Sequence, residues 1–251
     1  MINFRDMGGI VTADGRKIKT GLLFRADTIR PRNKKQLQYL LSLNLDYIID
    51  LRNPYEIEKH PNFIPEGAKY INAPVLIDKV DSNVVPKSIR LYFKTAVKEE
   101  VEKDIIEFAE TYKDMPYATK AYTHLFQAMN EHKKIAFHCA AGKDRTGIAA
   151  MIVQLALGCT KESVIEEYLK SNYYRRRFNR IRYFLLSLLI KKRFLRDYFV
   201  ACAYAHKSYI ESALKAISDK YAAIEEFLLN EYGITNKDID SWKEFYLEKD
   251  N

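Results

Sequence analysis

Residues 138–147 read His138-Cys139-Ala140-Ala141-Gly142-Lys143-Asp144-Arg145-Thr146-Gly147. They follow an apolar run at 134–138 and precede a helix-forming run at 148–157, so they join a buried strand to a helix. A loop that ends at a helix N-terminus directs several backbone N–H groups at one centre, and the helix dipole adds positive potential there. The stretch therefore predicts a binding site for a phosphate dianion.

The residue types in this loop favour nucleophilic chemistry on phosphorus. The positive potential favours the thiolate of Cys139, which is the attacking form of cysteine. Arg145 follows after five intervening residues and offers a planar fork for two phosphate oxygens, which a lysine could not match. Gly142 lets the backbone curl around the anion. A free cysteine is usually a small buried hydrophobe, but this combination of strand end, spacing and helix indicates a catalytic Cys139.

Working outward, short strands alternate with helices through the first half of the chain. A hairpin is expected over 10–19, strands over 22–26, 47–51, 70–74 and 134–138, and helices from about Asn33, over 88–112 and over 117–130. Residues 146–247 read as nearly all helical, with a cap at Thr160 and a stop at Gly233. This order predicts an α/β fold with a mostly parallel central sheet flanked by helices, and Cys139 at the carboxyl end of a strand, where ligands bind.

Bulk properties limit the functional classes. The chain has 251 residues, 47% of them hydrophobic, which suits one domain over 1–251. The net charge of +8 predicts attraction to anions. The three cysteines are widely spaced, which suits a reducing compartment and a cytoplasmic location, although no feature rules out a trimmed leader and export of a native form. The longest apolar run, 183–190, is too short for a transmembrane segment.

The loop resembles the active-site loop of the protein tyrosine phosphatase superfamily, and its Gly-Lys-Asp-Arg-Thr-Gly version is similar to the bacterial branch of atypical tyrosine phosphatases. Segments 3–9, 14–16, 21–25 and 49–52 resemble the N-terminal half of that branch in the same order. The resemblance implies the cysteine-dependent phosphatase fold, a phosphocysteine intermediate, and no cofactor or metal. It also implies phosphorylated protein or peptide substrates. Some members of the branch accept phosphoserine, phosphothreonine or phosphoinositides as well as phosphotyrosine, so the resemblance leaves the breadth of the substrate range open.

The resemblance also suggests roles for residues near the cysteine. It implies that Asp144 is the general acid, and Asp50, Asp104 and Asp114 are the alternatives. Ala140, Ala141, Gly142, Lys143 and Arg145 are expected to bind phosphate. Lys143 is expected to attract a second anionic group, or else to be a solvated surface lysine.

Four residues are expected to support the loop. His138 is expected to hold the loop by hydrogen bonding. Thr146 is expected to contact the sulfur or to satisfy the helix start. Asp50 and Arg52 are expected to brace the loop or to close off the end of a strand.

The segment 170–196 has ten Lys or Arg and no Asp or Glu, and its apolar residues Ile181, Phe184, Leu185, Leu188 and Leu189 fall at helical spacing. Three interpretations stay open. The region 170–205 is a helical lid or substrate-recruiting insertion, a peripheral contact with an anionic membrane, or a plain core-facing helix. A nucleic-acid partner is not expected, because no recognised binding motif accompanies the charge.

Two other functional classes remain as alternatives to the phosphatase. In a non-catalytic binding module, the same loop would hold a phosphorylated ligand without turnover. In a sulfur-transfer domain, a loop cysteine would also be used, but Arg145 at this spacing and the following Thr146-Gly147 favour phosphate.

Overall fold

A mostly parallel sheet organises the computed structural model, which describes residues 1–75 and 95–249. Its strand order is β1 (Arg5–Asp6), β2 (Leu23–Ala26), β5 (Ile135–His138), β3 (Tyr47–Asp50) and β4 (Lys69–Asn72). β1 pairs antiparallel with β2, and the other neighbours pair in parallel. The predicted α/β class is therefore confirmed, and the strand before the Cys139 loop lies at the centre of the sheet.

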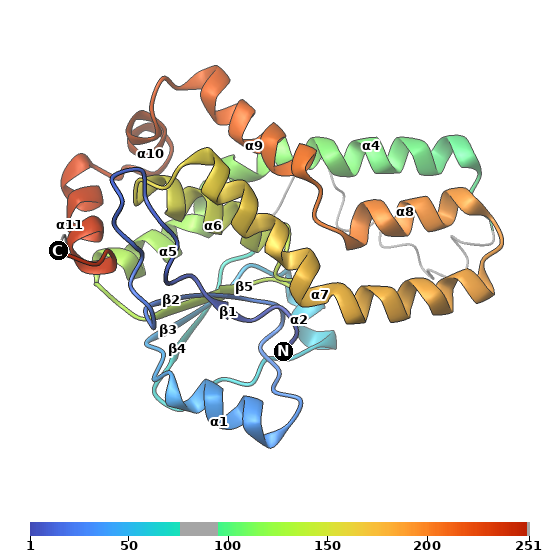
Figure 1. The fold of residues 1–251 in the computed structure, drawn as a ribbon, viewed down its shortest axis with the longest axis horizontal. Helices are drawn as coiled ribbons and strands as arrows, with labels where there is room; N and C mark the ends of the chain where they lie inside the picture. The colour runs from blue at the N-terminus through green and yellow to red at the C-terminus, as the bar shows by residue number, and fades with distance from the viewer. Residues whose placement is uncertain (76–94, 250–251) are drawn as a thin grey trace.

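Three parallel strands end at the same level. His138 of β5 pairs with Ala26 of β2 on one side and with Asp50 of β3 on the other. The segments that follow these strands therefore meet at the carboxyl edge of the sheet. The short helix α2 (Pro54–Lys59) lies at the same edge (Figure 1).

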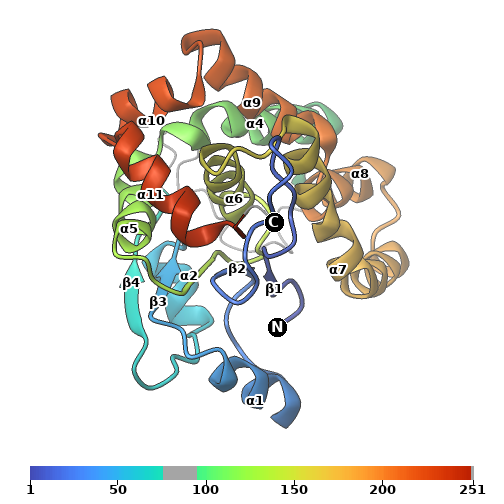
Figure 2. The same cartoon turned by 60° about the vertical axis from the view of Figure 1, so that its left-hand side comes forward.

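Side chains alternate between the two faces of the sheet, as the period of two in a strand requires. One face presents Leu23, Ile49, Ile135 and Phe137 to the larger core, and the other presents Phe24, Ile48 and Ala136 to a smaller one. Figures 1 and 2 show α1 (Lys34–Ser42) on the second side, and α5 (Thr119–Asn130) and α6 (Arg145–Ala156) on the first. Helices thus cover both faces of the sheet, as expected.

The remaining helices form a layer beyond α6. They are α4 (Lys98–Asp114) with the short 3₁₀ turn η1 (Met115–Tyr117), α7 (Lys161–Leu189), α8 (Arg193–Ala203), α9 (Lys207–Lys220), α10 (Ile224–Tyr232) and α11 (Asn236–Tyr246). The ends of α4, α7 and α8 project together past the carboxyl edge of the sheet (Figure 1). We call residues 170–205, the second part of α7 with α8, the arm.

Local signals located several helix ends correctly. Asn33 caps α1 by accepting a hydrogen bond from the N–H of Gln36, and Thr160 caps α7 in the same way through Ser163. Gly233 ends α10 in the left-handed region, with φ of +68°. In the expected hairpin, Val11 and Lys17 form an isolated antiparallel bridge instead of strands.

Two elements were not predicted, and one prediction lies partly outside the described residues. Of the helix expected over 88–112, residues 88–94 lie outside the described residues, and α4 covers the part from Lys98 onward. The sequence pattern did not predict β1 or α2. The signal for α2 was the capping box of Asn53 and Glu56, which exchange hydrogen bonds of 2.9 and 3.0 Å.

The arm corrects one interpretation of the basic segment. Its five apolar residues at helical spacing are exposed, from 49% for Ile181 to 83% for Leu189. A plain core-facing helix would bury this stripe, so that interpretation is wrong.

Candidate active site

The loop that leaves β5 has its carbonyl groups fixed from outside. The amide of Asn3 donates to the carbonyls of Ala141 and Gly142, at 3.0 and 2.9 Å. Arg25 donates to the carbonyl of Gly142 at 2.9 Å, and Arg175 of α7 donates to that of Ala141 at 3.1 Å. Three side chains from distant parts of the chain therefore set the conformation of this loop.

The first two loop carbonyls are held in the same way. The imidazole Nδ1 of His138 lies 3.1 Å from the carbonyl of Cys139, and the backbone N–H of Thr28 donates to that of Ala140 at 3.4 Å. In a planar trans peptide the N–H points opposite to the C=O, so the N–H groups of residues 140–143 face the other side of the loop. Within residues 1–75 and 95–249, no group accepts a hydrogen bond from the N–H groups of residues 140–145. They form a cradle of donors for an anion.

Gly142 is required at its position for two reasons. Its φ is +65°, a conformation that L side chains rarely adopt. A Cβ built on it would lie 2.4 Å from the carbonyl oxygen of Ala26. The loop can therefore approach the end of β2 this closely only with glycine.

Cys139 and Arg145 stand at the two ends of the cradle. Cys139 is 1% exposed, directly after β5, and Arg145 is the first residue of α6. The guanidinium of Arg145 donates through both terminal nitrogens to Glu56 of α2, at 2.7 and 2.7 Å, and to the carbonyl of Leu51 at 3.3 Å. Glu56 thus fixes the plane and direction of the arginine fork.

Sequence reasoning missed Glu56. Burial opposes its ionisation, but the hydrogen bonds and charge of Arg145 outweigh burial and lower the pKa of Glu56 below its ordinary value. Glu56 is therefore ionised at neutral pH. The capping box that places it at the third position of α2 was the available signal, but nothing in that motif names Arg145 as its partner.

Asp144 lies beside the cradle and is held by two neighbours. Its carboxylate accepts a hydrogen bond from the phenol of Tyr112 on α4, and it lies 3.1 Å from the ammonium of Lys143. Burial and the adjacent carboxylate raise the pKa of Tyr112 well above its ordinary value, so the phenol stays protonated and donates. The hydroxyl of Tyr168 lies 2.9 Å from that of Tyr112 and extends the network to α7.

The rival acids differ in their surroundings. Asp50 is fully buried and accepts hydrogen bonds from Arg52, Asn62 and Tyr70. Burial opposes its charge, yet the hydrogen bonds and charge of Arg52 lower the pKa of Asp50. This carboxylate is already saturated with donors. Asp104 and Asp114 lie on α4, partly exposed.

Lys143 is buried, which corrects the interpretation of a solvated surface lysine. It is 1% exposed, and its ammonium donates to the carbonyls of Cys202 and Tyr204, each at 2.8 Å. These carbonyls close the C-terminal end of α8, where a cation is favoured by the helix dipole. The side chain therefore ties the loop to the arm, and its charge already has partners in the protein.

The supporting residues form one buried network at the ends of β3 and β5. Arg52 donates to both oxygens of Asp50, at 2.9 and 2.6 Å, and to the carbonyl of His60 at 2.7 Å. The amide of Asn62 lies 2.8 Å from Asp50 and 3.1 Å from Nε2 of His138. We assign the proton of His138 to Nδ1 from these contacts, because Nε2 faces a donor.

Thr146 is fully buried on α6. Its hydroxyl has no hydrogen-bond partner in the described part of the chain.

A buried ion cluster connects α7 to the loop. Glu167 of α7 is 3% exposed and pairs with Arg5 at 2.6 Å and with Arg25. Arg25 in turn donates to the carbonyl of Gly142. Burial opposes ionisation of Glu167, but the two arginines lower its pKa. Sequence patterns gave no signal for this cluster. Arg5 and Arg25 are 20 positions apart, and Arg5 and Glu167 are 162 positions apart, so only the fold brings them together.

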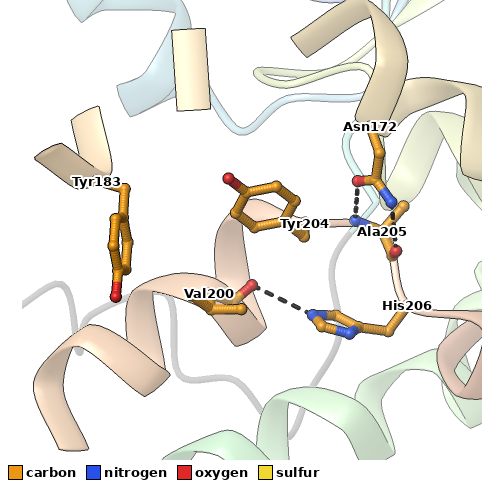
Figure 3. Close-up of a pocket in the computed structure, with 6 residues that line it drawn as sticks. All are labelled: Asn172, Tyr183, Val200, Tyr204, Ala205 and His206. Carbon is orange, nitrogen blue, oxygen red and sulfur yellow. Dashed lines mark hydrogen bonds between the residues drawn. The ribbon is translucent and has the colours of Figure 1, made fainter. Parts of the chain in front are cut away.

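The junction of α7, α8 and α9 contains a cavity of about 380 Å³ (Figure 3). Asn172 of α7 both donates to and accepts from the backbone of Ala205, at 2.8 Å each, and His206 lies 3.2 Å from the carbonyl of Val200. Tyr183 and Tyr204 form its aromatic walls. The junction holds in place the carbonyl of Tyr204, which Lys143 contacts.

Residues 1–75 and 95–249 contain neither a membrane-spanning helix nor a metal-binding cluster. No helix there combines the length and apolar character needed to cross a bilayer. No group of three or more His, Cys, Asp or Glu side chains there is arranged to hold a metal ion.

Comparison with known proteins agrees with this site. A protein of Cupriavidus necator whose name assigns it to the tyrosine-protein phosphatases is 26% identical over 227 residues, covering 90% of this chain and 80% of that protein. The triple specificity protein phosphatase PtpB of Mycobacterium tuberculosis is 25% identical over 189 residues, covering 68% of this chain and 66% of that protein. Residues 1–248 match the sequence profile of the tyrosine phosphatase family. The chain therefore belongs to the tyrosine phosphatase family.

Proposed function

We propose that this enzyme hydrolyses phosphotyrosine in proteins through a phosphocysteine intermediate on Cys139. The observation that carries the proposal is the cradle itself. Its carbonyls are fixed outward by Asn3, Arg25 and Arg175, so its N–H groups face a common centre between Cys139 and Arg145. Such preorganised donors favour a phosphoryl group whose charge is spread over its equatorial oxygens.

Binding uses the backbone and one side chain. The N–H groups of Ala140, Ala141, Gly142 and Lys143 contact the phosphate oxygens, and Arg145 completes the ring. Because Glu56 occupies the two terminal nitrogens of Arg145 from one side, the arginine presents its remaining N–H groups to the phosphate. The Lys143 side chain acts by fixing the loop to α8.

The reaction has two steps. In the first, the Cys139 sulfur attacks phosphorus, the bond to the leaving oxygen breaks, and Asp144 donates a proton to that oxygen. In the second, Asp144 accepts a proton from water, the water oxygen attacks phosphorus, and the phosphorus–sulfur bond breaks, releasing phosphate and the thiolate. Tyr112 positions the Asp144 carboxylate. Thr146, whose buried hydroxyl has no other partner in the described residues, stabilises the sulfur as it leaves.

The substrate range is proposed to be broader than phosphotyrosine. PtpB of Mycobacterium tuberculosis is named a triple specificity protein phosphatase, which supports activity on more than one class of substrate here. The branch that the loop resembles suggests phosphoserine and phosphothreonine as the further classes. The ten basic residues between 170 and 196 lie in the arm beside the site and support recruitment of multiply charged substrates such as phosphoinositides.

The organisation is proposed as one phosphatase domain over 1–251, with the arm as a lid or substrate-recruiting element. Its contacts through Arg175 and Lys143 support this role, because movement of the arm would act directly on the loop. Free thiols at Cys139, Cys159 and Cys202 support a cytoplasmic location. No nucleic-acid partner is proposed.

The test is phosphate release by the wild-type protein and by Cys139→Ser, with chelator present. The panel contains phosphotyrosine, phosphoserine and phosphothreonine peptides and phosphoinositide vesicles. Release that the substitution abolishes is expected, with phosphotyrosine peptides turned over fastest. Tight binding of phosphorylated peptides without release from any of them would replace this proposal with the binding module.

A further inference from the structure

The outer side of α7 exposes apolar side chains in a row. Tyr173, Ile181, Phe184 and Leu188 are 61%, 49%, 60% and 65% exposed. With Arg177 they follow each other at steps of three or four residues, so they share one side of the helix. We call Tyr173, Ile181, Phe184, Leu185 and Leu188 the exposed stripe. A stripe of this size is a mark of an interaction surface, because water-exposed apolar residues usually occur singly.

The charged residues that α7 carries around the exposed stripe are all basic. Arg176, Arg177 and Arg180 are exposed beside it, and the guanidinium of Arg176 lies 4.3 Å from the ring centre of Tyr173. No Asp or Glu occurs between Lys170 and Arg196. The partner of this surface must therefore offer both a place for apolar side chains and negative charge.

We propose that the exposed stripe docks on the surface of an anionic lipid bilayer. Apolar and aromatic side chains of an interfacial helix enter the boundary between headgroups and acyl chains, while neighbouring Arg and Lys contact lipid phosphates. A second copy of the chain docked through the same surface would bring like charges together, because residues 170–196 contain no acidic side chain to compensate them. A nucleic acid would match the charge but would leave Phe184 and Leu188 in water.

Docking would place the active-site edge of the sheet next to the bilayer. The arm that carries the exposed stripe projects past that edge (Figure 1). Arg175, on the same helix, donates to the carbonyl of Ala141 in the loop. Docking of this surface on a bilayer requires no turnover at Cys139.

The test measures flotation of the full-length protein with vesicles of phosphatidylcholine alone or with about 30% phosphatidylserine. Binding is expected only with the anionic vesicles and is expected to weaken at high salt. The double variant Phe184→Ser/Leu188→Ser should bind about tenfold more weakly, because two apolar side chains no longer enter the interface. The triple variant of Arg176, Arg177 and Arg180 to Ser should bind about a hundredfold more weakly.

The matched control is Leu41→Ser/Leu229→Ser, which alters two exposed leucines on α1 and α10, and it should bind as the wild type does. Thermal unfolding followed by circular dichroism should match the wild type in all three variants, which shows that they fold. Binding to neutral vesicles, no binding, or equal binding by the stripe variants and the control would overturn the proposal. So would a dimer in solution that requires Phe184 and Leu188. The same flotation with Cys139→Ser separates this outcome from a failure of the catalytic proposal.

Discussion

Replacing Glu56 with Gln tests whether the orientation of Arg145 matters to the reaction. Gln keeps one carboxyl-like oxygen and still fits the capping box of α2, so the helix should remain. The second oxygen becomes an NH₂ group that faces a guanidinium N–H, and one of the two 2.7 Å hydrogen bonds is lost. A charge-assisted hydrogen bond contributes about 1.5–3 kcal/mol, and 1.36 kcal/mol is tenfold in rate.

The pair is 20% and 25% exposed, so the lower part of this range applies, and kcat should fall about 10- to 50-fold. KM should stay unchanged or fall, because the loss of a negative charge leaves Arg145 more attractive to phosphate. Steady-state kinetics on a phosphotyrosine peptide give both constants. Glu58→Gln, an exposed change on the same helix, is the matched control. Equal kcat in the two variants would refute the positioning role of Glu56.

Three further substitutions test other parts of the site. Gly142→Ala should lower the free energy of unfolding about 1–3 kcal/mol more than Gly15→Ala, measured in urea, because both have positive φ but only Gly142 lies against backbone. Asp144→Asn should lower kcat about 10²- to 10⁴-fold on phosphotyrosine peptides. The loss should be much smaller on an aryl phosphate with a more acidic leaving group, because that group needs less protonation as it leaves. Equal losses of kcat on the two substrates would exclude Asp144 as the general acid. Glu167→Gln should cost about 3 kcal/mol of stability at pH 7. The pKa of Glu167 is lowered in the folded protein, so its ionised form stabilises the fold above the ordinary carboxyl pKa, and this stabilisation is lost as the pH falls through the folded pKa. Glu167→Gln should therefore lose less stability between pH 7 and pH 3 than the wild type. Equal losses of unfolding free energy in the two proteins between these pH values would contradict this.

Features encoded by local patterns could be predicted from the sequence. The loop, its central strand and its helix follow from residue types within 20 positions of Cys139. The caps at Asn33 and Thr160 and the glycine stop at Gly233 depend on single residues beside a helix end. The parallel sheet follows from the alternation of strands and helices.

Contacts between distant segments could not be predicted in this way. The hydrogen bond from Tyr112 to Asp144 spans 32 positions, and that from Arg175 to Ala141 spans 34. No periodicity or spacing links such pairs, because the packing of α4 and α7 against the loop brings them together. Lys143 shows the same limit: its local sequence suggests a free cation, and only the position of α8 supplies the two carbonyls that bind it.

The burial of polar groups explains the remaining difference. Asp50 and Arg52 were expected to brace the loop or to close off the end of a strand, and they form a fully buried ion pair that also contacts Asn62 and Tyr70. Buried charges require partners, and these partners come from the segment after α2 and from β4. The sequence indicated the residue types but not this enclosure.

The most direct test of the central claim is to trap the covalent intermediate. Wild-type protein is mixed with a phosphotyrosine peptide, quenched in acid within milliseconds, digested, and analysed by mass spectrometry for a phosphoryl group on the peptide that contains Cys139. We predict a phosphoryl group on the Cys139 sulfur in the wild type and in an Asp144→Asn variant assayed with an aryl phosphate, and none on Cys159 or Cys202. Full turnover with an unmodified Cys139 at every quench time, or turnover that persists in Cys139→Ser, would contradict the claim.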